Sequence, residues 1–561
     1  MAKSLSNKEI ALAFSELAGL MELHDQNSFT VTSYKNAYRF LRKLGDPLSE
    51  MSKEELENIR GVGKAIAGKI QEMLETGTMA LLDKWRGETP AGIQQMLKVK
   101  GFGPKKIGVI WRKMGIEDVG ELLLACHENR LVDIKGFGAK SQTSLREQLE
   151  YFMQSKDSYH YATLVPLAQE LLDKLYDLYP DERHELTGEI RRLCPVLDQV
   201  DLITTAESPY DFADGEEIQM VKEEDSYWEL STPAGLEIRL HLSEPEDFGT
   251  RWFQSTNPES FTQFCLEKGE GELEDLEVEE QVFESLKLPF VAPELRETDL
   301  ASPGLSPGQK ILDGSTLDLV EEKDVKGVVH AHSTYSDGLN SLIEMANRCR
   351  ELGYSYLGIT DHSKSAFYAD GLVEERVEMQ WREIDQLNQQ FDDFVIFKGI
   401  ESDILGDGSL DYEEDYLKGF DFIIASVHSN LKMDQEKATK RVLAAVENPY
   451  TTMLGHPTGR LLLSRKGYPL DHQKIIDACA ANGVAIEINA NPLRLDLDWQ
   501  WIPYALEKGV KISVNPDAHS LGGIEDIKWG IAAARKGGLQ ALDCPCCLDA
   551  ESFLSFCKSK Q

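Results

Sequence analysis

Histidine and carboxylate residues recur after short apolar segments in the carboxyl-terminal part of the chain. The set is His330-Ala-His332 with Asp337, Asp361-His362, Glu401 with Asp403, His428, His456, and Asp517-Ala-His519. It takes up six of the chain's 12 histidines, so a shared site is favoured over scattered surface residues. These side chains are the ligands that Zn²⁺, Mn²⁺ and Fe²⁺ prefer, and the absence of cysteine from the set favours a hydrolytic centre over a structural zinc site.

The elements that must position these residues are apolar runs separated by amphipathic stretches. Seven runs have the sequences KGVVHAH, YSYLGITDH, FVIFKGIESD, FDFIIASVH, TTMLGHP, GVAIEINA and VKISVNPDAH. Alternation of buried strands with helices predicts a β/α barrel, and the active groups of such barrels lie at the carboxyl ends of the strands. The pattern therefore predicts that the histidines and carboxylates converge at one end of a barrel.

Three loops near the start of the chain share a second pattern: an apolar and a basic residue precede Gly-apolar-Gly, and lysine follows within two positions. Their glycines and lysines are Gly61, Gly63 and Lys64; Gly101, Gly103 and Lys105; and Gly136, Gly138 and Lys140. An amphipathic helix follows each loop, and the N–H groups at its start can hold a phosphate oxygen beside the lysine. The pattern predicts contacts to a nucleic-acid backbone; the alternative is that the glycines only make tight turns.

Charge is distributed unevenly over the 561 residues, whose formal total is −37. Residues 1–150 carry 22 basic and 20 acidic side chains, residues 151–300 carry 11 and 36, and residues 301–561 carry 26 and 40. A protein held to DNA by general surface charge is excluded, because phosphate neutralisation needs clustered Lys and Arg. The near-neutral first part fits local phosphate contacts, whereas the acidic second part would repel DNA and is a candidate surface for a protein partner.

Several other protein classes are excluded by composition. Hydrophobic residues make up 42% of the chain, which is enough for buried cores and excludes general disorder. No run of about 18 apolar residues is present, so no membrane span is expected. The first residues, MAKSLSNKEIALAFSEL, lack the apolar core of a signal peptide. The nine cysteines are scattered except for Cys544, Cys546 and Cys547, which predicts a reduced cytoplasmic protein without a disulfide framework.

The carboxyl-terminal motifs resemble those of the PHP (polymerase and histidinol phosphatase) family. They are His-x-His with a following Ser-Asp-Gly, Thr-Asp-His-Ser, Gly-Ile-Glu, Ser-Val-His, Gly-His-Pro-Thr-Gly-Arg and Asp-Ala-His. The resemblance implies three divalent metal ions. One would be held by His330, His332, Glu401 and Asp517, a second by Glu401, His428 and His456, and a third by Asp337, His362 and His519.

The same resemblance implies hydrolysis of a phosphoester, with Mn²⁺ favoured for nuclease activity, Zn²⁺ often retained and Fe²⁺ a further candidate. The catalytic residues would include His330, His332, Glu401 and Asp517. Arg460, in Gly-His-Pro-Thr-Gly-Arg, and Arg494, in Asn-Pro-Leu-Arg, are candidates to hold a substrate phosphate. The alternative for both arginines is pairing with nearby acids such as Asp496.

The first 153 residues resemble the amino-terminal helix-hairpin-helix domain of the family X DNA polymerases. The segment from Phe29 to Arg39 and the first hairpin carry the likeness. The resemblance implies that a lysine on the helix after the hairpin can form a Schiff base with an abasic sugar. Lys69 occupies the matching position, and the alternative is a solvated helix lysine.

The middle of the chain resembles the polymerase region of the same family but departs from it at the active site. The segment 279–297 carries the likeness. The family has Gly-Ser before two arginines, and three aspartates that hold two metal ions. Here Glu189 replaces the serine, and Gln199, Asp201 and Arg239 occupy the three aspartate positions. Asp198 lies one residue early and would point to the opposite face of its strand. We expect a polymerase fold without polymerase activity.

The whole order resembles bacterial family X DNA polymerases that carry a carboxyl-terminal PHP domain. We expect an all-α helix-hairpin-helix domain at 1–153 and an α+β nucleotidyltransferase-like domain, of the polymerase palm and fingers type, at 154–298. A linker rich in Pro, Gly and Ser should occupy 299–323, and a distorted (β/α)7 PHP barrel should occupy 324–561.

The leading functional hypothesis is a metal-dependent phosphoesterase that acts on gapped, nicked or 3′-recessed DNA in repair, as a 3′-5′ exonuclease or in 3′-end or abasic-site processing. The first alternative, a working polymerase with a proofreading PHP domain, is opposed by Gln199 and Arg239. The second is a small-molecule phosphomonoesterase of the histidinol phosphatase type. The three hairpins oppose it, because such an enzyme does not need to bind DNA. The third, a non-enzymatic DNA-end scaffold, is opposed by the nine filled ligand positions.

Overall fold

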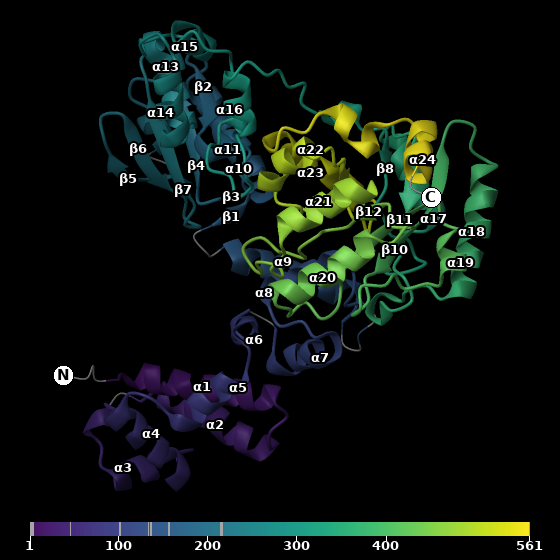
Figure 1. Cartoon of the computed structure of the whole chain (residues 1–561). Coiled ribbons are helices and arrows are strands. Elements are labelled where there is room, and N and C mark those ends of the chain that lie inside the picture. Colours follow the sequence, from purple (N-terminus) through teal and green to yellow (C-terminus); the bar gives the residue numbers. More distant parts are fainter. Residues whose placement is uncertain are drawn as a thin grey trace. The chain divides into compact units, whose positions relative to one another are not determined.

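The computed structural model describes residues 5–44, 47–99, 102–132, 134, 137–154, 158–213 and 217–559. The chain forms two compact units (Figure 1). The helical unit comprises Met1–Cys126 with Leu131–Phe152, and the larger unit comprises His127–Arg130 with Met153–Gln561. Gly101 and Gly136, two of the hairpin glycines expected to contact DNA, lie outside the described residues.

The described part of the helical unit consists of helices joined by short loops. They are α1 (Asn7–Leu23), α2 (Ser28–Leu41), α3 (Lys53–Asn58), α4 (Lys64–Thr76), α5 (Ala80–Glu88), α6 (Ala91–Met96), α7 (Pro104–Met114), α8 (Val119–His127) and α9 (Ala139–Gln154). Ser6 and Glu9 form a reciprocal capping box that satisfies two N–H groups at the start of α1. Phe14 on α1 stacks with Tyr34 on α2, with ring centroids 5.9 Å apart, inside the core of this unit.

The first part of the larger unit is built on a five-stranded mixed sheet with the order β2-β4-β7-β6-β5. Strand β4 pairs with β7 in parallel, and the other neighbours are antiparallel. The strands are β2 (His184–Thr187), β4 (Gln199–Thr204), β5 (Gln219–Glu223), β6 (Tyr227–Ser231) and β7 (Glu237–Leu242), and β1 (Tyr159–His160) pairs separately with β3 (Val196–Leu197). The helices are α10 (Tyr161–Leu178), α11 (Gly188–Arg191), α12 (Tyr210–Ala213), α13 (Phe248–Thr256), α14 (Glu259–Lys268), α15 (Glu279–Ser285) and α16 (Pro307–Leu312). Buried Leu202, Trp228 and Leu240 form part of the core on one face of the sheet.

The second part of the larger unit is a parallel barrel with the strand order β14-β13-β12-β11-β10-β9-β8. The strands are β8 (Gly327–Val328), β9 (Tyr356–Ile359), β10 (Val395–Asp403), β11 (Phe422–Ser426), β12 (Met453–Leu454), β13 (Ala485–Asn489) and β14 (Ile512–Asn515). A parallel bridge between Ala331 and Ala518 joins the chain beyond β8 to the chain beyond β14, so the barrel is nearly closed. The order of the strands along the sheet follows the sequence, which confirms the expected seven-stranded barrel.

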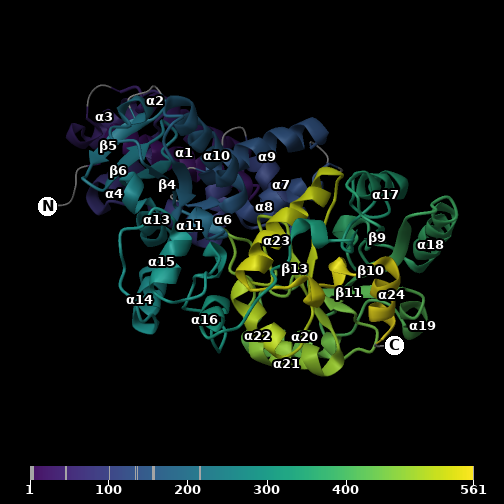
Figure 2. The same cartoon turned by 90° about the horizontal axis from the view of Figure 1, so that it is seen from above.

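Helices surround these strands (Figure 2). They are α17 (Leu342–Glu351), α18 (Glu374–Asn388), α19 (Glu414–Leu417), α20 (Gln435–Val446), α21 (His472–Asn482), α22 (Ile502–Glu507), α23 (Ile527–Lys536) and α24 (Ala550–Lys558). Every residue of β9, β11, β13 and β14 is buried, as expected for parallel strands that are covered by helices. Phe553 on α24 packs against Tyr356 and Phe422, the first residues of β9 and β11, so α24 covers the amino ends of these strands.

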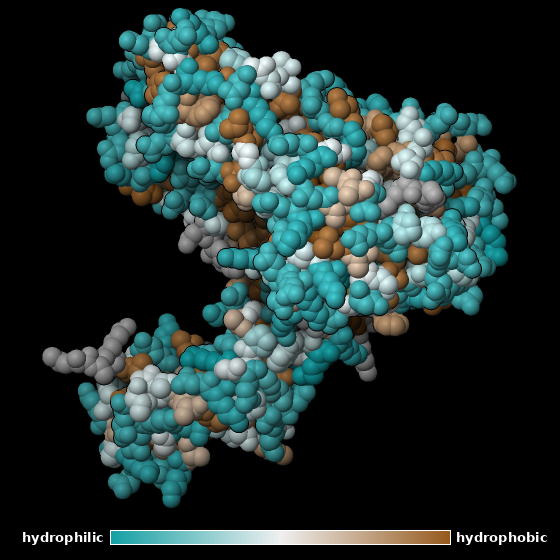
Figure 3. Space-filling view, in the orientation of Figure 1, coloured by the Kyte–Doolittle hydropathy of each residue, from teal (hydrophilic) through white to brown (hydrophobic). Residues whose placement is uncertain are grey.

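Hydrophilic residues dominate the visible faces of both units (Figure 3), and large exposed apolar side chains such as Phe29 and Leu542 are dispersed along the sequence. Within the described residues, no helix combines the length and apolar character needed to span a membrane.

Candidate functional site

The carboxyl ends of the barrel strands bring the expected histidines and carboxylates together. His330 and His332 follow β8, Glu401 lies near the end of β10, and Asp517 follows β14. At the bridge that closes the barrel, the His332 N–H donates to the Ala518 carbonyl at 2.8 Å, which places the first and last motifs side by side. Asp517 has a φ of 52°, a strained conformation that tends to persist at functional sites.

Glu401 is the centre of this arrangement. Its Oε1 atom lies 3.1 Å from His428 Nε2, 2.9 Å from His456 Nε2 and 3.4 Å from His330 Nε2. Its Oε2 atom lies 2.9 Å from His362 Nδ1. A carboxylate between imidazoles from four strand ends has the geometry of a bridging ligand.

A second carboxylate, Asp337, faces His519 and the opposite nitrogen of His362. Its oxygens lie 3.4 Å from His519 Nε2 and 3.6 Å from His362 Nε2. The His332 and His519 rings stack with centroids 4.2 Å apart, and His332 Nε2 lies 3.0 Å from Asp517 Oδ1. A row of imidazoles therefore connects Asp337 with Asp517.

Three groups of these residues place one ligand atom each within 4.8 Å of one another. They are His332, Asp337, His362 and His519; His330, His332 and Asp517; and His362, Glu401 and His428. All nine expected ligands therefore come together, His456 through its contact with Glu401. The grouping differs in detail from the expected sets, because His332 also faces Asp337 and His362 lies between Asp337 and Glu401.

The buried polar atoms of the centre fit divalent cations. Several of them make no well-aligned hydrogen bond, even where a charged group lies near, namely His330 Nε2, His332 Nδ1, Asp337 Oδ2, His362 Nδ1, Glu401 Oε2, His456 Nδ1 and His519 Nε2. An unsatisfied buried polar group is costly, and so many in one place need a common partner. Imidazole nitrogens and carboxylate oxygens are suitable ligands for Mn²⁺, Zn²⁺ or Fe²⁺.

The electrostatics of the centre keep its carboxylates ionised. Burial would raise the pKa of Glu401, but the charges of His428 and His330 outweigh burial and hold that pKa well below its usual range. Burial likewise opposes the charge on Asp517, and the charge of His330 holds the pKa of this carboxyl low. Ionised carboxylates in a buried setting are stable only with positive charge nearby, which metal ions can supply.

Two carboxylates orient histidines of the centre: Asp403, which the sequence placed at a strand end, and Glu487, which was not predicted as part of the site. Glu487 on β13 is fully buried and lies 2.6 Å from His330 Nδ1, and it also accepts hydrogen bonds from the N–H of His456 at 3.0 Å and from Asn515 at 2.8 Å. Asp403 pairs with Nδ1 of His428. A carboxylate behind a metal-binding histidine fixes its ring and tautomer. The signal for Glu487 was a single acid inside the apolar run GVAIEINA.

Asp361, which ends the second predicted strand, belongs to none of the three groups of ligand atoms. Its carboxylate accepts hydrogen bonds from the N–H of Ser333 at 2.8 Å, the N–H of Ser336 at 3.1 Å and Gln380 Nε2 at 2.6 Å. Asp361 therefore holds the loop that carries Asp337 toward the centre.

The two candidate phosphate-binding arginines differ in their surroundings. Arg460 pairs with Asp498, and its Nε donates to the carbonyl oxygen of Arg494 at 3.1 Å, so much of its guanidinium is engaged. Arg494 is buried, and its Nη2 lies 3.4 Å from Oε1 of Glu128, in the segment His127–Arg130 of the same unit. The Nε atom of Arg494 has no hydrogen-bond partner. The geometry favours Arg494 over Arg460 as a group that can reach a ligand.

The mixed sheet has the replacements that the sequence indicates. Asp201 on β4 lies opposite Arg239 on β7, and Gln199 donates to Asp201 Oδ1 at 2.8 Å. Arg239 Nη2 lies 3.7 Å from Oε1 of Glu229. Asp198 is exposed and accepts a hydrogen bond from Ser158 at 2.6 Å. Among the described residues, no group of three potential metal ligands gathers at this sheet.

The arginines that precede these positions are also engaged. Arg191 makes a two-pronged pair with Glu279, at 2.9 Å and 2.6 Å, and its guanidinium stacks 3.5 Å from the centre of the Trp252 ring. Arg192 donates from Nε to Glu297 Oε1 at 2.9 Å. Glu189, at the position of the family's serine, has Oε1 3.7 Å from Arg192 Nη2. Acids of the chain therefore engage both guanidinium groups.

The backbone requires glycine at Gly61, whereas a Cβ atom at Gly63, Gly103 or Gly138 would meet open space. Gly61 has a φ of 82°, and a Cβ atom there would lie 2.5 Å from the Phe40 ring, so only glycine fits. Gly63 and Gly103 are the N-terminal caps of α4 and α7, and Gly138 precedes α9. Lys64, Lys105 and Lys140 are exposed in the first turns of these helices. Lys69 lies on α4 and is half-buried.

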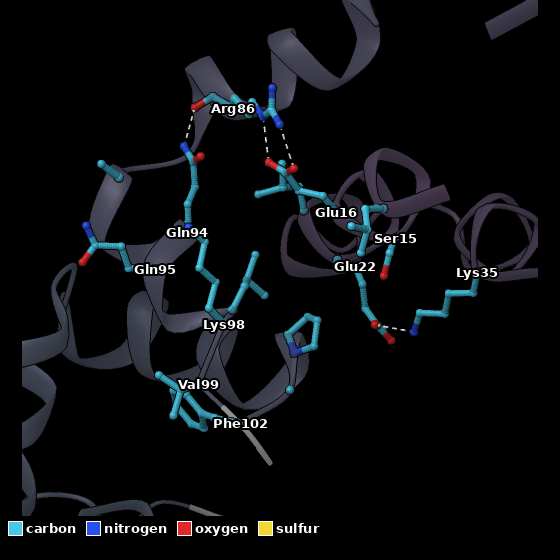
Figure 4. A pocket seen from close by; sticks show the side chains of 17 residues that line it. Ser15, Glu16, Glu22, Lys35, Arg86, Gln94, Gln95, Lys98, Val99 and Phe102 are labelled. Atoms are coloured by element: carbon cyan, nitrogen blue, oxygen red, sulfur yellow. Dashed lines mark hydrogen bonds and ion pairs between the residues drawn. The ribbon is translucent and has the colours of Figure 1, made fainter. Parts of the chain in front are cut away.

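A groove of about 1060 Å³ lies in the helical unit beside the second hairpin. Figure 4 shows Arg86 paired with Glu16, at 2.7 Å, and Lys35 paired with Glu22, at 2.6 Å. Gly103 and Pro104, at the start of α7, contribute to its wall. Because acids of the groove neutralise these two cations, it offers less to an anion than the exposed helix starts do.

Comparison with known proteins identifies the family. A helix-hairpin-helix domain model matches residues 5–79, a SAM-like helix-hairpin-helix tandem model matches 93–150, and a PHP domain model matches 329–491. The chain is 31% identical to the DNA polymerase/3′-5′ exonuclease PolX of Bacillus subtilis strain 168, over 98% of this chain and 99% of the relative.

The chain belongs to the family X DNA polymerases. Two further relatives match about a third of the chain. A probable phosphatase of Thermoanaerobacter sp. strain X514 is 30% identical over 34% of this chain and 77% of the relative, and a probable phosphatase of Vibrio atlanticus is 28% identical over 36% and 82%. This family X protein is therefore similar over nearly its whole length to a protein named as a DNA polymerase and 3′-5′ exonuclease. Over about a third of its length it is also similar to probable phosphatases.

Proposed function

We propose that this family X protein is a metal-dependent phosphoesterase that removes nucleotides from DNA 3′ ends in repair, and that its polymerase module is inactive. The observation that carries the proposal is the convergence of nine histidine and carboxylate side chains, Glu401 and Asp337 among them, at the carboxyl ends of the barrel strands. The relative's name includes a 3′-5′ exonuclease, which supports the choice of reaction. The proposed domains are 1–153, 154–298 and 324–561, and the scattered spacing of the cysteines in the sequence supports a location in the cytoplasm.

Different residues of the centre have different roles in the proposed hydrolysis. When bound, divalent ions activate water for attack on phosphorus and offset the charge of the phosphate. We assign three ions, Mn²⁺ or Zn²⁺ with Fe²⁺ as an alternative, to the nine ligands. Glu487 and Asp403 hold the rings of His330 and His428 in place. Arg494 is suited to orient the phosphate, because its buried Nε atom lacks a partner.

DNA would be held by the helix-hairpin-helix motifs. The exposed lysines Lys64, Lys105 and Lys140 in the first turns of α4, α7 and α9 fit phosphate oxygens of the backbone, because free N–H groups at a helix start can bind the same oxygens. Such contacts position DNA without reading its sequence. This supports DNA as the partner; we propose that the DNA is gapped, nicked or 3′-recessed, and that the acidic middle module is a candidate surface for a protein.

A panel of substrates tests the proposal. The full chain with Mn²⁺ is given a labelled 3′-recessed duplex, an abasic duplex and a small phosphomonoester, beside a variant with His330→Ala and His332→Ala. We expect nucleotide release from the recessed duplex that the variant lacks. Hydrolysis of the small ester alone would refute the proposal and favour the second candidate, a phosphatase, which the likeness to probable phosphatases supports.

The inactivity of the polymerase module is a separate part of the proposal. Gln199 and Arg239 in place of carboxylates, and the pairing of Arg191 with Glu279, support it. Primer extension on a gapped duplex with Mg²⁺ or Mn²⁺ tests it. No extension is expected, and robust incorporation that Asp201→Ala abolishes would show a working polymerase.

Lyase activity at Lys69 is a further part of the proposal. Its place on α4, behind the first hairpin, supports attack of a neutral amine on an abasic sugar. Borohydride should trap a covalent adduct with abasic DNA in the parent and in Lys64→Ala but not in Lys69→Ala. The absence of an adduct in the parent would remove this activity from the proposal.

A further inference from the structure

Three cysteines near the carboxyl terminus form a compact cluster outside the histidine–carboxylate centre. Cys546 and Cys547 lie on the turn η9 (Pro545–Cys547), and Cys544 lies between this turn and η8 (Ala541–Asp543). Their three Sγ atoms all lie within 4.8 Å of one another, and those of Cys544 and Cys546 are 3.1 Å apart. Cys544 and Cys546 are buried, and Cys547 is half-buried.

The cluster lies at the opposite end of the barrel from the histidine centre. The Lys326 N–H, just before β8, donates to the Cys546 carbonyl at 2.8 Å. Lys511, just before β14, lies 2.8 Å from Oδ1 of Asp543. Because Lys326 and Lys511 precede their strands, the cluster adjoins the amino ends of β8 and β14. The ligands His330 and Asp517 lie beyond the carboxyl ends of the same strands.

Cys349 shows the more usual environment of a buried cysteine, in which no second sulfur is needed. Cys349 on α17 lies among apolar residues such as Leu342 and Met345, and burial raises its pKa to about 12. Such a thiol acts as a small apolar side chain. Packing of this kind explains one buried cysteine at a time, but it does not require three sulfurs to face one another.

We propose that Cys544, Cys546 and Cys547 form a three-sulfur site for one zinc ion, separate from the histidine–carboxylate centre. A Zn–S bond of about 2.3 Å in tetrahedral geometry places sulfurs about 3.8 Å apart, within the range that the cluster spans. The half-buried position of Cys547 leaves room for a water as fourth ligand. Binding forms three Zn–S bonds as three thiol protons pass to solvent, so no oxidant or reductant is needed.

The site would stabilise the end of the barrel rather than take part in the chemistry. The chain leaves Cys547 for α24, whose Phe553 packs with its ring centroid 5.1 Å from that of Tyr356 on β9. An ion that fixes residues 544–547 would therefore hold α24 over the amino ends of the strands. The competing chemistry is a disulfide between Cys544 and Cys546, which would need the sulfurs to approach to about 2.05 Å.

Cobalt substitution of the full chain tests the zinc site. Thiolate ligands give Co²⁺ a near-ultraviolet charge-transfer band that imidazole and carboxylate ligands do not give, so the histidine centre does not contribute to it. We expect this band in the Co²⁺-loaded parent and in Cys349→Ser, and its loss in a variant with Cys544→Ser and Cys546→Ser. We also expect Zn²⁺ to slow alkylation of Cys547 in the parent and in a variant with His330→Ala and His332→Ala.

Two results would overturn the site. One is the absence of the charge-transfer band in Co²⁺-loaded parent protein whose nine cysteines all react with a thiol reagent after denaturation and are therefore reduced. This result excludes the site even where the serine variant fails to fold. The other is an intact mass 2 Da below that of the reduced chain with Cys544 linked to Cys546, because a disulfide removes two of the three ligands. Neither result depends on nuclease activity.

Discussion

The carboxylate of Glu487 lies 2.6 Å from Nδ1 of His330, and both side chains are fully buried. This contact leaves Nε2 of His330 directed at Glu401 and Asp517, with 3.4 Å to an oxygen of each. Glu487 on β13 therefore orients an imidazole that follows β8, across the closure of the barrel, where β14 is the one strand between them.

Replacing Glu487 by Gln should weaken metal binding at the centre. The amide cannot supply the negative charge behind His330, and loss of such an orienting partner costs about 10-fold to 100-fold in metal affinity or activity. Titration of nuclease activity with Mn²⁺ measures the effect, and high Mn²⁺ should restore the rate. Glu436→Gln, an exposed position on α20, is the control. Unchanged Mn²⁺ dependence in Glu487→Gln would contradict an orienting role.

Arg494→Ala should impair the reaction with DNA without removing metal. A charge-assisted contact to phosphate is worth about 1.5–3 kcal/mol, which corresponds to a loss of about tenfold to hundredfold in kcat/KM. Arg460→Ala should instead lower thermal stability, because its guanidinium is engaged by Asp498 and by the carbonyl of Arg494. Steady-state kinetics and metal analysis check both variants. A loss of bound metal in Arg494→Ala would show that the arginine supports the centre itself.

The location of the candidate centre could be predicted from sequence, but its internal grouping could not. Carboxyl ends of parallel strands meet at one edge, so His330 and Asp517 had to approach one another once the barrel was recognised. Whether His362 faces Asp337, Glu401 or both depends on the path of the loop after β9, and both contacts are present. Glu487 lies 157 residues from His330 in the chain, and only the arrangement of strands shows that they touch.

The fold of the middle module shows a similar limit. The spacing around Arg191 placed Gln199 and Asp201 correctly on one strand, and the register with β7 sets Asp201 opposite Arg239. The contacts that engage Arg191, through Glu279 and Trp252, come from helices that follow the sheet and give no short-range pattern in the sequence.

The hairpin lysines should contribute to DNA binding through charge alone. A variant with Lys64→Ala, Lys105→Ala and Lys140→Ala should bind all DNA sequences more weakly, and the slope of log affinity against log salt should fall by about 1 for each phosphate that is no longer neutralised. Fluorescence anisotropy at several salt concentrations measures both. Lys84→Ala on α5 is the control. An unchanged salt slope in the triple variant would exclude these helix starts as the DNA-binding groups.

Glu297 should make stability depend on pH. Burial opposes its charge, but Lys536 and Arg192 outweigh burial and lower its pKa from 4.5 to about 2. A depressed folded-state pKa adds stability above the unfolded value, of order 3 kcal/mol at pH 7, and this stability is lost as the pH falls from about 4.5 to about 2. Denaturant unfolding should show Glu297→Gln less stable than the parent at pH 7, with a smaller difference at pH 3. Glu259→Gln is the exposed control, and a difference that grows toward pH 3 would contradict the assigned sign.

The centre around Glu401 should hydrolyse the 3′ ends of DNA. The most direct measurement follows a 5′-labelled, 3′-recessed duplex on a sequencing gel with the full chain and Mn²⁺, beside Glu401→Gln and the surface control Glu436→Gln. Stepwise shortening of the recessed strand by the parent and the control, with none above background for Glu401→Gln, is the predicted result. Shortening by Glu401→Gln at the rate of the parent would contradict the assignment of the nuclease reaction to this centre.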